Sequence, residues 1–275
     1  MINLQTYFWI ILVTCFENCG GLNVISRRRA LDALLVGSTA ASISVPLISS
    51  LQANAVEDND ELIDVYFGCG CFWHVQHEFV EAEKRILNRE DSSFTARAGY
   101  AGGLGPSDKV CYHNALQEGD YGSLGHAEVV GLRLPASSLE SFAMEYFKLF
   151  DEKGNRPDQN VDRGPEYRNL IGIPGGSKSP YATKIVSASQ AMGDKLDFAV
   201  GKGNDKDLRA VSFIMDTAKF PFHSAEQYHQ FHDGFNLGEN YPSSYNNLAT
   251  KLASEGKLVD SKCPKGLIGI GVAGL

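Results

Sequence analysis

Residues 64–77, DVYFGCGCFWHVQH, form the junction that decides the fold. Their first five residues are mostly apolar and predict a short strand, and the glycines that follow allow the chain to turn sharply. A helix that begins directly after this turn is predicted by apolar residues at helical spacing, namely Phe72, Val75, Phe79 and Ile86. The junction therefore places Cys71 at the N-terminus of a predicted helix.

Strands and helices alternate through the rest of the chain. Ser137 to Glu140 reads as a capping box that opens an amphipathic helix ending near Phe150. Residues 167–173 predict a strand, residues 181–196 a long helix, and residues 208–215 a strand with apolar residues on both faces. This order predicts an α+β or α/β domain in which helices pack on a sheet.

Charge divides the chain into two unequal parts. The sequence has 275 residues, with 25 Lys and Arg against 33 Asp and Glu, and a net charge of −8. An acidic balance argues against nucleic acid as the main partner, because phosphate binding needs clustered Lys and Arg. Only five of the 58 charged side chains lie in residues 1–55. We therefore expect residues 1–55 to be a targeting presequence and residues 56–275 to be one domain.

Two apolar stretches in the presequence suggest two processing signals in series. Residues 7–16 have the length of a signal-peptide core, and residues 33–55 are uncharged and end on Ala53-Asn54-Ala55, which fits a cleavage site. Residues 26–31, SRRRAL, resemble a twin-arginine export signal. The series resembles the layered precursors of algal plastid proteins and predicts a plastid, with the thylakoid lumen as the further destination. Entry into the secretory pathway and an uncleaved membrane anchor are the alternatives.

Cys71 is the most informative of the six cysteines. A thiol at a helix N-terminus faces free backbone N–H groups and the positive end of the helix dipole, which favour the thiolate. An inert buried thiol is the alternative. A second alternative is a zinc site, because Cys69, Cys71, His74 and His77 provide four ligands within nine residues. His229 and His232 form another pair, which we expect on a solvated helix face.

Five blocks of sequence resemble, in order, those of the peptide methionine sulfoxide reductase A family. They are residues 70–73 (GCFW), 99–103 (GYAGG), 125–128 (GHAE), 159–168 (QNVDRGPEYR) and 225–230 (AEQYHQ). The resemblance implies a two-layer, ferredoxin-like α+β sandwich with a mixed sheet, in a single catalytic domain. It also implies thiol-dependent reduction of methionine (S)-sulfoxide, in proteins or as the free amino acid, back to methionine.

The resemblance assigns a role to each expected site residue. Cys71 would be the nucleophile that ends as a sulfenic acid, and Glu128 the general acid, which burial must keep protonated. Tyr112 and Tyr167 would hold the sulfoxide oxygen, and Asp162 would position the substrate backbone or support the residues around the site. Phe72 and Trp73 would pack against the substrate methyl group. No cofactor and no metal are implied.

A second thiol must reduce the sulfenic acid. We expect Cys263 to be this resolving cysteine, with Cys111, Cys69 and an external thiol as alternatives. The resemblance implies thioredoxin as the reductant, with glutaredoxin or glutathione as substitutes, and a monomer that repairs oxidised proteins. His74 and Gln76 replace residues usual in the family, which leaves open an inactive binder of oxidised peptides.

Overall fold

A mixed sheet organises the part of the chain that the structure, a computed structural model, describes: residues 60–105, 108–234, 240–258 and 260–264. The predicted presequence lies outside these residues. The strands are β1 (Leu62–Gly68), β2 (Arg97–Ala101), β3 (Ala127–Pro135), β4 (Leu170–Ile173), β5 (Asp197–Val200), β6 (Val211–Asp216) and β7 (His223–Ser224). The α-helices are α1 (Phe72–Leu87), α2 (Leu139–Lys148), α3 (Tyr181–Ala191) and α4 (Ser243–Ser254).

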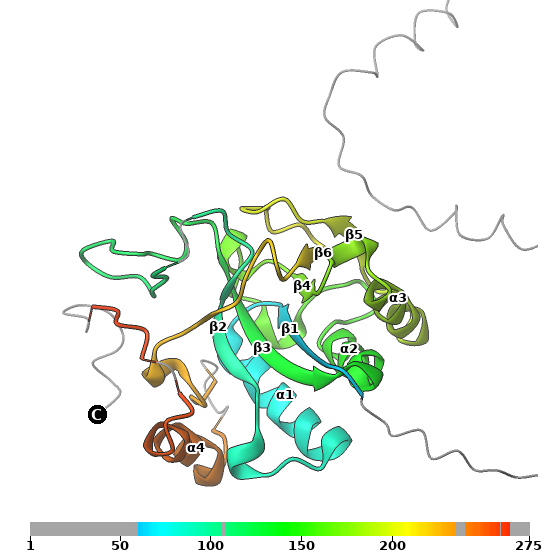
Figure 1. The fold of residues 1–275 in the computed structure, drawn as a ribbon. Coiled ribbons are helices and arrows are strands. Elements are labelled where there is room, and N and C mark those ends of the chain that lie inside the picture. Colours follow the sequence, from blue (N-terminus) through cyan, green and yellow to red (C-terminus); the bar gives the residue numbers. More distant parts are fainter. Residues whose placement is uncertain (1–59, 106–107, 235–239, 259, 265–275) are drawn as a thin grey trace, which may run out of the picture.

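The strand order is β5-β6-β4-β1-β3-β2-β7, and the central four strands follow a β-α-β-β-α-β path (Figure 1). Each strand in the order β4-β1-β3-β2 is antiparallel to its neighbours, whereas β4, β6 and β5 are parallel. This is the ferredoxin-like arrangement, extended at both edges. The predicted α+β class with helices on a mixed sheet is confirmed.

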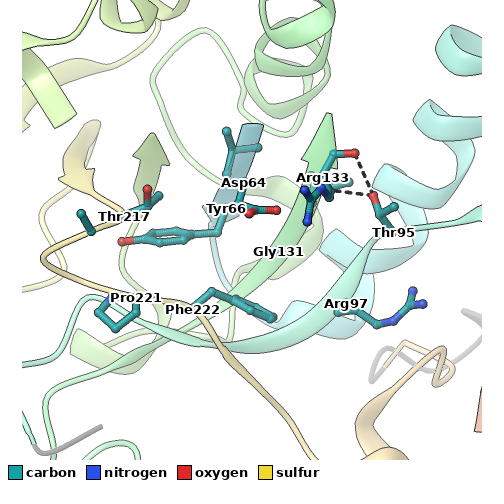
Figure 2. Close-up of a pocket in the computed structure, with 12 residues that line it drawn as sticks. Asp64, Tyr66, Thr95, Arg97, Gly131, Arg133, Thr217, Pro221 and Phe222 are labelled. Carbon is teal, nitrogen blue, oxygen red and sulfur yellow. Dashed lines mark hydrogen bonds between the residues drawn. The ribbon is translucent and has the colours of Figure 1, made fainter. Parts of the chain in front are cut away.

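Alternating side chains give the sheet two covered faces. Val65 and Phe67 of β1 point into the main core, where they meet apolar residues of α1, α2 and α3. Tyr66 points to the opposite face and donates a hydrogen bond to the carbonyl oxygen of Phe220. There, Phe222 covers Gly131, where a Cβ would lie 2.8 Å from the Phe222 ring (Figure 2). Strand β1 is therefore buried on both sides.

Several predicted boundaries need correction. The predicted capping box is wrong, because the Ser137 hydroxyl donates to the Asp60 carboxylate, and the N-cap residue of α2 is Ser138, whose side chain makes no cap bond. The strand predicted for 167–173 begins only at Leu170, after a 3-10 turn, and the helix predicted to reach residue 196 ends at Ala191. Among the described residues, no helix is long and apolar enough to cross a membrane.

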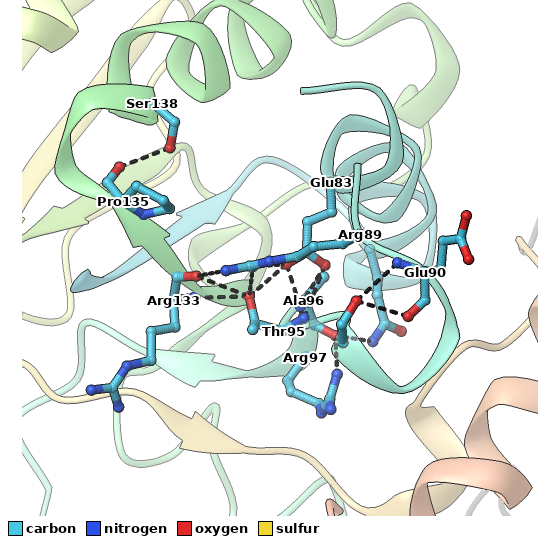
Figure 3. A network of polar contacts seen from close by, with 11 residues as sticks. Glu83, Arg89, Glu90, Thr95, Ala96, Arg97, Arg133, Pro135 and Ser138 are labelled. Atoms are coloured by element: carbon cyan, nitrogen blue, oxygen red, sulfur yellow. Dashed lines mark hydrogen bonds and ion pairs between the residues drawn. The ribbon is translucent and has the colours of Figure 1, made fainter. Parts of the chain in front are cut away.

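A buried carboxylate joins α1 to the segment before β2. Glu83 is fully buried, and its oxygens accept hydrogen bonds from the backbone N–H groups of Thr95 and Ala96 and from the Thr95 hydroxyl. Arg89 neutralises the charge and also donates to the carbonyl oxygen of Arg133 in β3 (Figure 3). The network fixes the far end of α1 against the sheet.

We expect Glu83→Ala to lower the free energy of unfolding by about 3–5 kcal/mol, because it leaves the Arg89 charge and two buried N–H groups without their partner. Glu81→Ala is the control on the same helix, since the Glu81 side chain is 43% exposed and its ion pair with Lys84 lies on the surface, and it should change stability by less than about 0.5 kcal/mol. Urea unfolding of both variants measures the difference. Equal effects would show that the network adds little to stability.

Candidate active site

The turn between β1 and α1 presents Cys71. Gly70 has φ +83°, a conformation that side chains rarely adopt, and its N–H donates to the carbonyl oxygen of Tyr167 at 3.0 Å. Cys71 is the N-cap residue of α1, and its N–H donates to Oε1 of Gln159 at 3.0 Å. The thiol is free and partly accessible. The predicted position of Cys71 at a helix N-terminus is confirmed.

Burial, however, raises the pKa of the Cys71 thiol well above its usual value of 9.0, and the Glu128 carboxylate adds to the rise. The N–H groups of Trp73 and His74 at the start of α1 act in the opposite direction but are outweighed. The helix N-terminus therefore acts on the Cys71 pKa in the predicted direction, but burial outweighs it in the free protein.

Glu128 lies on β3 directly beside this helix N-terminus. Its Oε2 accepts the N–H of Phe72 at 3.0 Å, and its Oε1 accepts the hydroxyl of Tyr121 at 3.2 Å. The side chain is buried, and burial raises its pKa to about 8 against these hydrogen bonds. The predicted rise of the Glu128 pKa by burial is thus confirmed, and a carboxyl with a pKa of about 8 can carry a proton at neutral pH.

Two tyrosines and one aspartate share the electrostatic environment of Glu128. Burial raises the pKa of both Tyr112 and Tyr167, and Glu128 raises it further, so both phenols stay protonated and can donate. Burial also raises the pKa of Asp162, which Arg156 lowers in turn. Arg156 donates to the backbone oxygens of both Asp162 and Tyr167, so one buried guanidinium orders both segments.

An aromatic group stands beside Cys71, as predicted for an apolar pocket. Phe72 and Trp73 are both buried, with ring centroids 6.3 Å apart. His229 lies 5.0 Å from Phe72 and 4.4 Å from Tyr112, and burial lowers its pKa to about 3. The predicted solvated position is therefore wrong for His229. Both of its ring nitrogens lack hydrogen-bond partners among the described residues.

Four residues of the site were given no role in it from the sequence. Tyr121 holds Glu128 and stacks 4.6 Å from Tyr100, and Gln159 holds the backbone of Cys71. Glu226 accepts hydrogen bonds from the Tyr100 hydroxyl and the Tyr112 N–H, both at 2.8 Å. His229 is the fourth. Gln159, Glu226 and His229 lie inside the quoted blocks, so the blocks were the sequence feature that could have identified them.

Cys263, the expected resolving cysteine, is paired with another cysteine in the structure. Cys263 forms a disulfide with Cys111, across 152 residues of sequence, and their Cα atoms lie 5.7 Å apart. Cys69 is buried and free, and burial raises its pKa to about 12. Cys263 is thus joined to Cys111 in this structure while Cys71 is free.

The predicted zinc alternative finds no geometric support. Within the described ranges, the potential metal ligands that gather around one point are Cys111, Glu226 and Cys263, and the set of Cys69, Cys71, His74 and His77 does not converge in this way.

Gln76, one of the two residues that are unusual for the family, is a buried structural group that donates to the carbonyl oxygen of Ala96 and to Gln230.

Most of the chain matches a known protein family. The family model for peptide methionine sulfoxide reductase matches residues 63–258. The chain belongs to the peptide methionine sulfoxide reductase family. The match begins within β1 and ends after α4, so it includes Cys71, Glu128 and both proposed tyrosines but not Cys263.

Individual family members are moderately similar. The peptide methionine sulfoxide reductase MsrA of Rippkaea orientalis is 30% identical over 168 residues, which cover 60% of this chain and 64% of the relative. MsrA of Geobacter metallireducens is 28% identical over 49% of this chain and 86% of its own length. The chain therefore spans a little under two thirds of the Rippkaea relative.

Two solved structures are also similar to the chain. Methionine sulfoxide reductase A of Corynebacterium diphtheriae has 18% identity and a TM-score of 0.40, over 66% of this chain and 84% of that protein. Reduced Mxr1 of Saccharomyces cerevisiae has 20% identity and a TM-score of 0.37, over 67% and 93%.

Proposed function

We propose that this reductase-family chain reduces methionine (S)-sulfoxide, in proteins or as the free amino acid, with Cys71 as nucleophile. The observation that carries the proposal is the neutral, buried Glu128 carboxyl, which is bonded to the first N–H of the helix that Cys71 caps. A thiol, a proton donor and an aromatic wall are what the reduction of an alkyl sulfoxide requires.

In the proposed reaction, oxygen moves from the substrate sulfur to the sulfur of Cys71. The Cys71 sulfur attacks the sulfoxide sulfur while Glu128 protonates the oxygen, which Tyr112 and Tyr167 hold by their phenols. A bond forms between the two sulfurs. The protonated oxygen then moves from the substrate sulfur to the Cys71 sulfur as the bond between the sulfurs breaks, so Cys71 becomes a sulfenic acid and methionine leaves. The thiol proton of Cys71 restores Glu128. The substrate sulfur is reduced and Cys71 is oxidised.

Phe72 and Trp73 pack the substrate methyl group in this proposal, and Asp162 positions the substrate backbone. Both aromatic side chains are buried beside Cys71, which supports the first role. Asp162 is supported by its electrostatic effect on Cys71 and Glu128.

Resolution of the sulfenic acid is proposed to run through Cys263. Its thiol attacks the Cys71 sulfenic acid, water leaves, and a disulfide between Cys71 and Cys263 forms. The Cys111 thiol then attacks Cys263 and releases Cys71 as a thiol. In the structure, Cys71 is free and Cys111 is joined to Cys263. This is the final state of the proposed series of thiol–disulfide steps and supports their order.

Cys111→Ser should therefore trap the disulfide between Cys71 and Cys263 after one equivalent of substrate, since the thiol that would release Cys71 is gone. Mass spectrometry of non-reduced peptides measures the pairing. Cys263→Ser is the matched variant and should leave Cys71 as a sulfenic acid, captured by dimedone. A disulfide between Cys71 and Cys111 in the Cys263 variant would assign resolution to Cys111 instead.

One assay separates this function from its alternatives: reduction of an (S)-sulfoxide substrate with dithiothreitol, with and without a chelator. The proposal requires turnover that the chelator does not change. Turnover lost with the chelator would favour a metal centre. Binding of an oxidised peptide without turnover would identify an inactive binder.

The electron donor and destination complete the proposal. Thioredoxin is proposed as the reductant of the disulfide, acting on a monomer. The support is that Cys263 lines an open groove of about 780 Å³, where a partner's thiol can reach it. Delivery to a plastid is proposed from residues 1–55 alone. N-terminal sequencing of the mature protein tests it, and a start before Ala30 would contradict it.

A further inference from the structure

Three potential metal ligands converge beside the catalytic pocket. A sulfur of Cys111, a sulfur of Cys263 and a carboxylate oxygen of Glu226 all lie within 4.8 Å of one another. Cys111 and Glu226 are buried, and Cys263 is partly exposed. The residues come from three distant parts of the sequence, so the fold alone assembles the group.

Glu226 provides the second observation. Only 8% of this residue is exposed, and the hydrogen bonds it accepts come from two neutral donors, the Tyr100 hydroxyl and the Tyr112 N–H. Within the described part of the chain, no Lys, Arg or His nitrogen is within ion-pair distance of its carboxylate. Buried carboxylates are normally paired with a cation or coordinate a metal.

We propose that reduction of the disulfide turns this group into a binding site for a thiophilic divalent cation such as Zn²⁺. A dithiol reductant supplies two electrons and two protons, which convert the disulfide to two thiols and the dithiol to its own disulfide. The cation then displaces the two thiol protons and binds both thiolates and a Glu226 oxygen.

The geometry suits tetrahedral coordination. The Cα atoms of the two cysteines are 5.7 Å apart, so their sulfurs can reach one ion by side-chain rotation. Each carboxylate oxygen of Glu226 keeps a lone pair after its hydrogen bond. Three protein ligands leave a fourth position for water. Cys263 and Glu226 line the open groove, which gives the ion a path from solvent.

Bound metal should also control the proposed reaction, a consequence that rests on the proposed function. A thiolate held by a metal cannot attack the Cys71 sulfenic acid. Zn²⁺ should therefore block multiple turnovers with a dithiol while leaving the first turnover, at Cys71, intact.

Cobalt titration of the full chain tests the site without requiring any turnover. The protein is reduced, freed of reductant under anaerobic conditions, and titrated with Co²⁺. We expect one equivalent to bind with a thiolate-to-cobalt charge-transfer band, which Zn²⁺ then removes. The oxidised protein, whose sulfurs are joined, should show no band.

Variants locate the ion. Cys111→Ser and Cys263→Ser should each remove most of the band, and Glu226→Gln should weaken binding by about tenfold or more. Cys69→Ala and Cys71→Ser are the matched controls and should keep both the charge-transfer band and the affinity for cobalt. Near-ultraviolet circular dichroism checks that each variant is folded.

Three results would overturn the proposal: no band in the reduced protein, equal binding by the oxidised protein, or loss of the band in the Cys71 variant. The last result would place the ion at Cys69, Cys71, His74 and His77. Because the titration contains no sulfoxide, an inactive enzyme would still give a clear answer, so failure of the metal site and failure of the proposed reductase activity are distinguishable.

Discussion

Cys71→Ser should lower the turnover of methionine (S)-sulfoxide on the order of 10³-fold or more, because a serine hydroxyl cannot replace the thiol that accepts the oxygen. The loss should be in kcat rather than in substrate binding, since Phe72, Trp73 and the two phenols remain. Single-turnover measurements of methionine formed per mole of protein provide the direct test.

Cys69→Ala is the matched control for this prediction. Cys69 lies two residues from Cys71, but it is fully buried, whereas Cys71 is partly exposed, so we expect a sulfoxide to reach Cys71 and not Cys69. The Cys69 variant should form the same number of equivalents of methionine as the wild type. Full turnover by Cys71→Ser would mean that a different thiol attacks the sulfoxide.

The sequence predicted the junction at Cys71 well because local patterns determine it. A short apolar run, glycines that allow a sharp turn and helical spacing from Phe72 onward all concern neighbouring residues. The buried state of Glu128 was expected only through the family resemblance, since β3 carries buried residues on both faces and gives no local sign of it.

Other features depend on contacts between distant residues, which spacing does not encode. The disulfide joins residues 152 apart, and neither cysteine has a neighbour that identifies the other. Tyr121 meets Glu128 because the segment that begins at Cys111 folds back, as the hydrogen bond from the N–H of Tyr121 to the carbonyl oxygen of Cys111 records. The burial of a thiol also depends on distant residues. A prediction from the helix N-terminus alone therefore missed the rise in the pKa of Cys71 that burial causes.

Glu128→Gln is expected to lower kcat/KM by about 10²–10⁴-fold at pH 7, the range typical of a lost general acid. The amide keeps the size of the side chain, and its oxygen can still accept the N–H of Phe72, so Cys71 stays in place. What is lost is the proton for the departing oxygen. Near-full turnover at pH 7 by this variant, with none by the Cys71 variant, would contradict the role of Glu128.

The pH dependence gives a sharper signature. Glu128 acts in its protonated form and has a pKa of about 8, so wild-type turnover at the sulfoxide step should fall as the pH rises through about 8. Glu128→Gln should lack this decrease, because its side chain does not titrate. Glu118→Gln, on an exposed side chain that pairs with Lys109, is the control and should keep the wild-type profile.

Stability should depend on the same proton, with a sign that follows from the direction of the shift. The folded protein holds the Glu128 proton up to about pH 8, whereas the unfolded chain releases it near the ordinary value of 4.5. Stability from this proton is therefore complete below pH 4.5 and is lost as the pH rises to about 8, by at most about 1.4 kcal/mol per pH unit. Urea unfolding of the wild type and Glu128→Gln between pH 5 and pH 9 measures it. The variant should gain on the wild type as the pH rises, and parallel curves would mean that Glu128 is ionised in the folded protein at neutral pH.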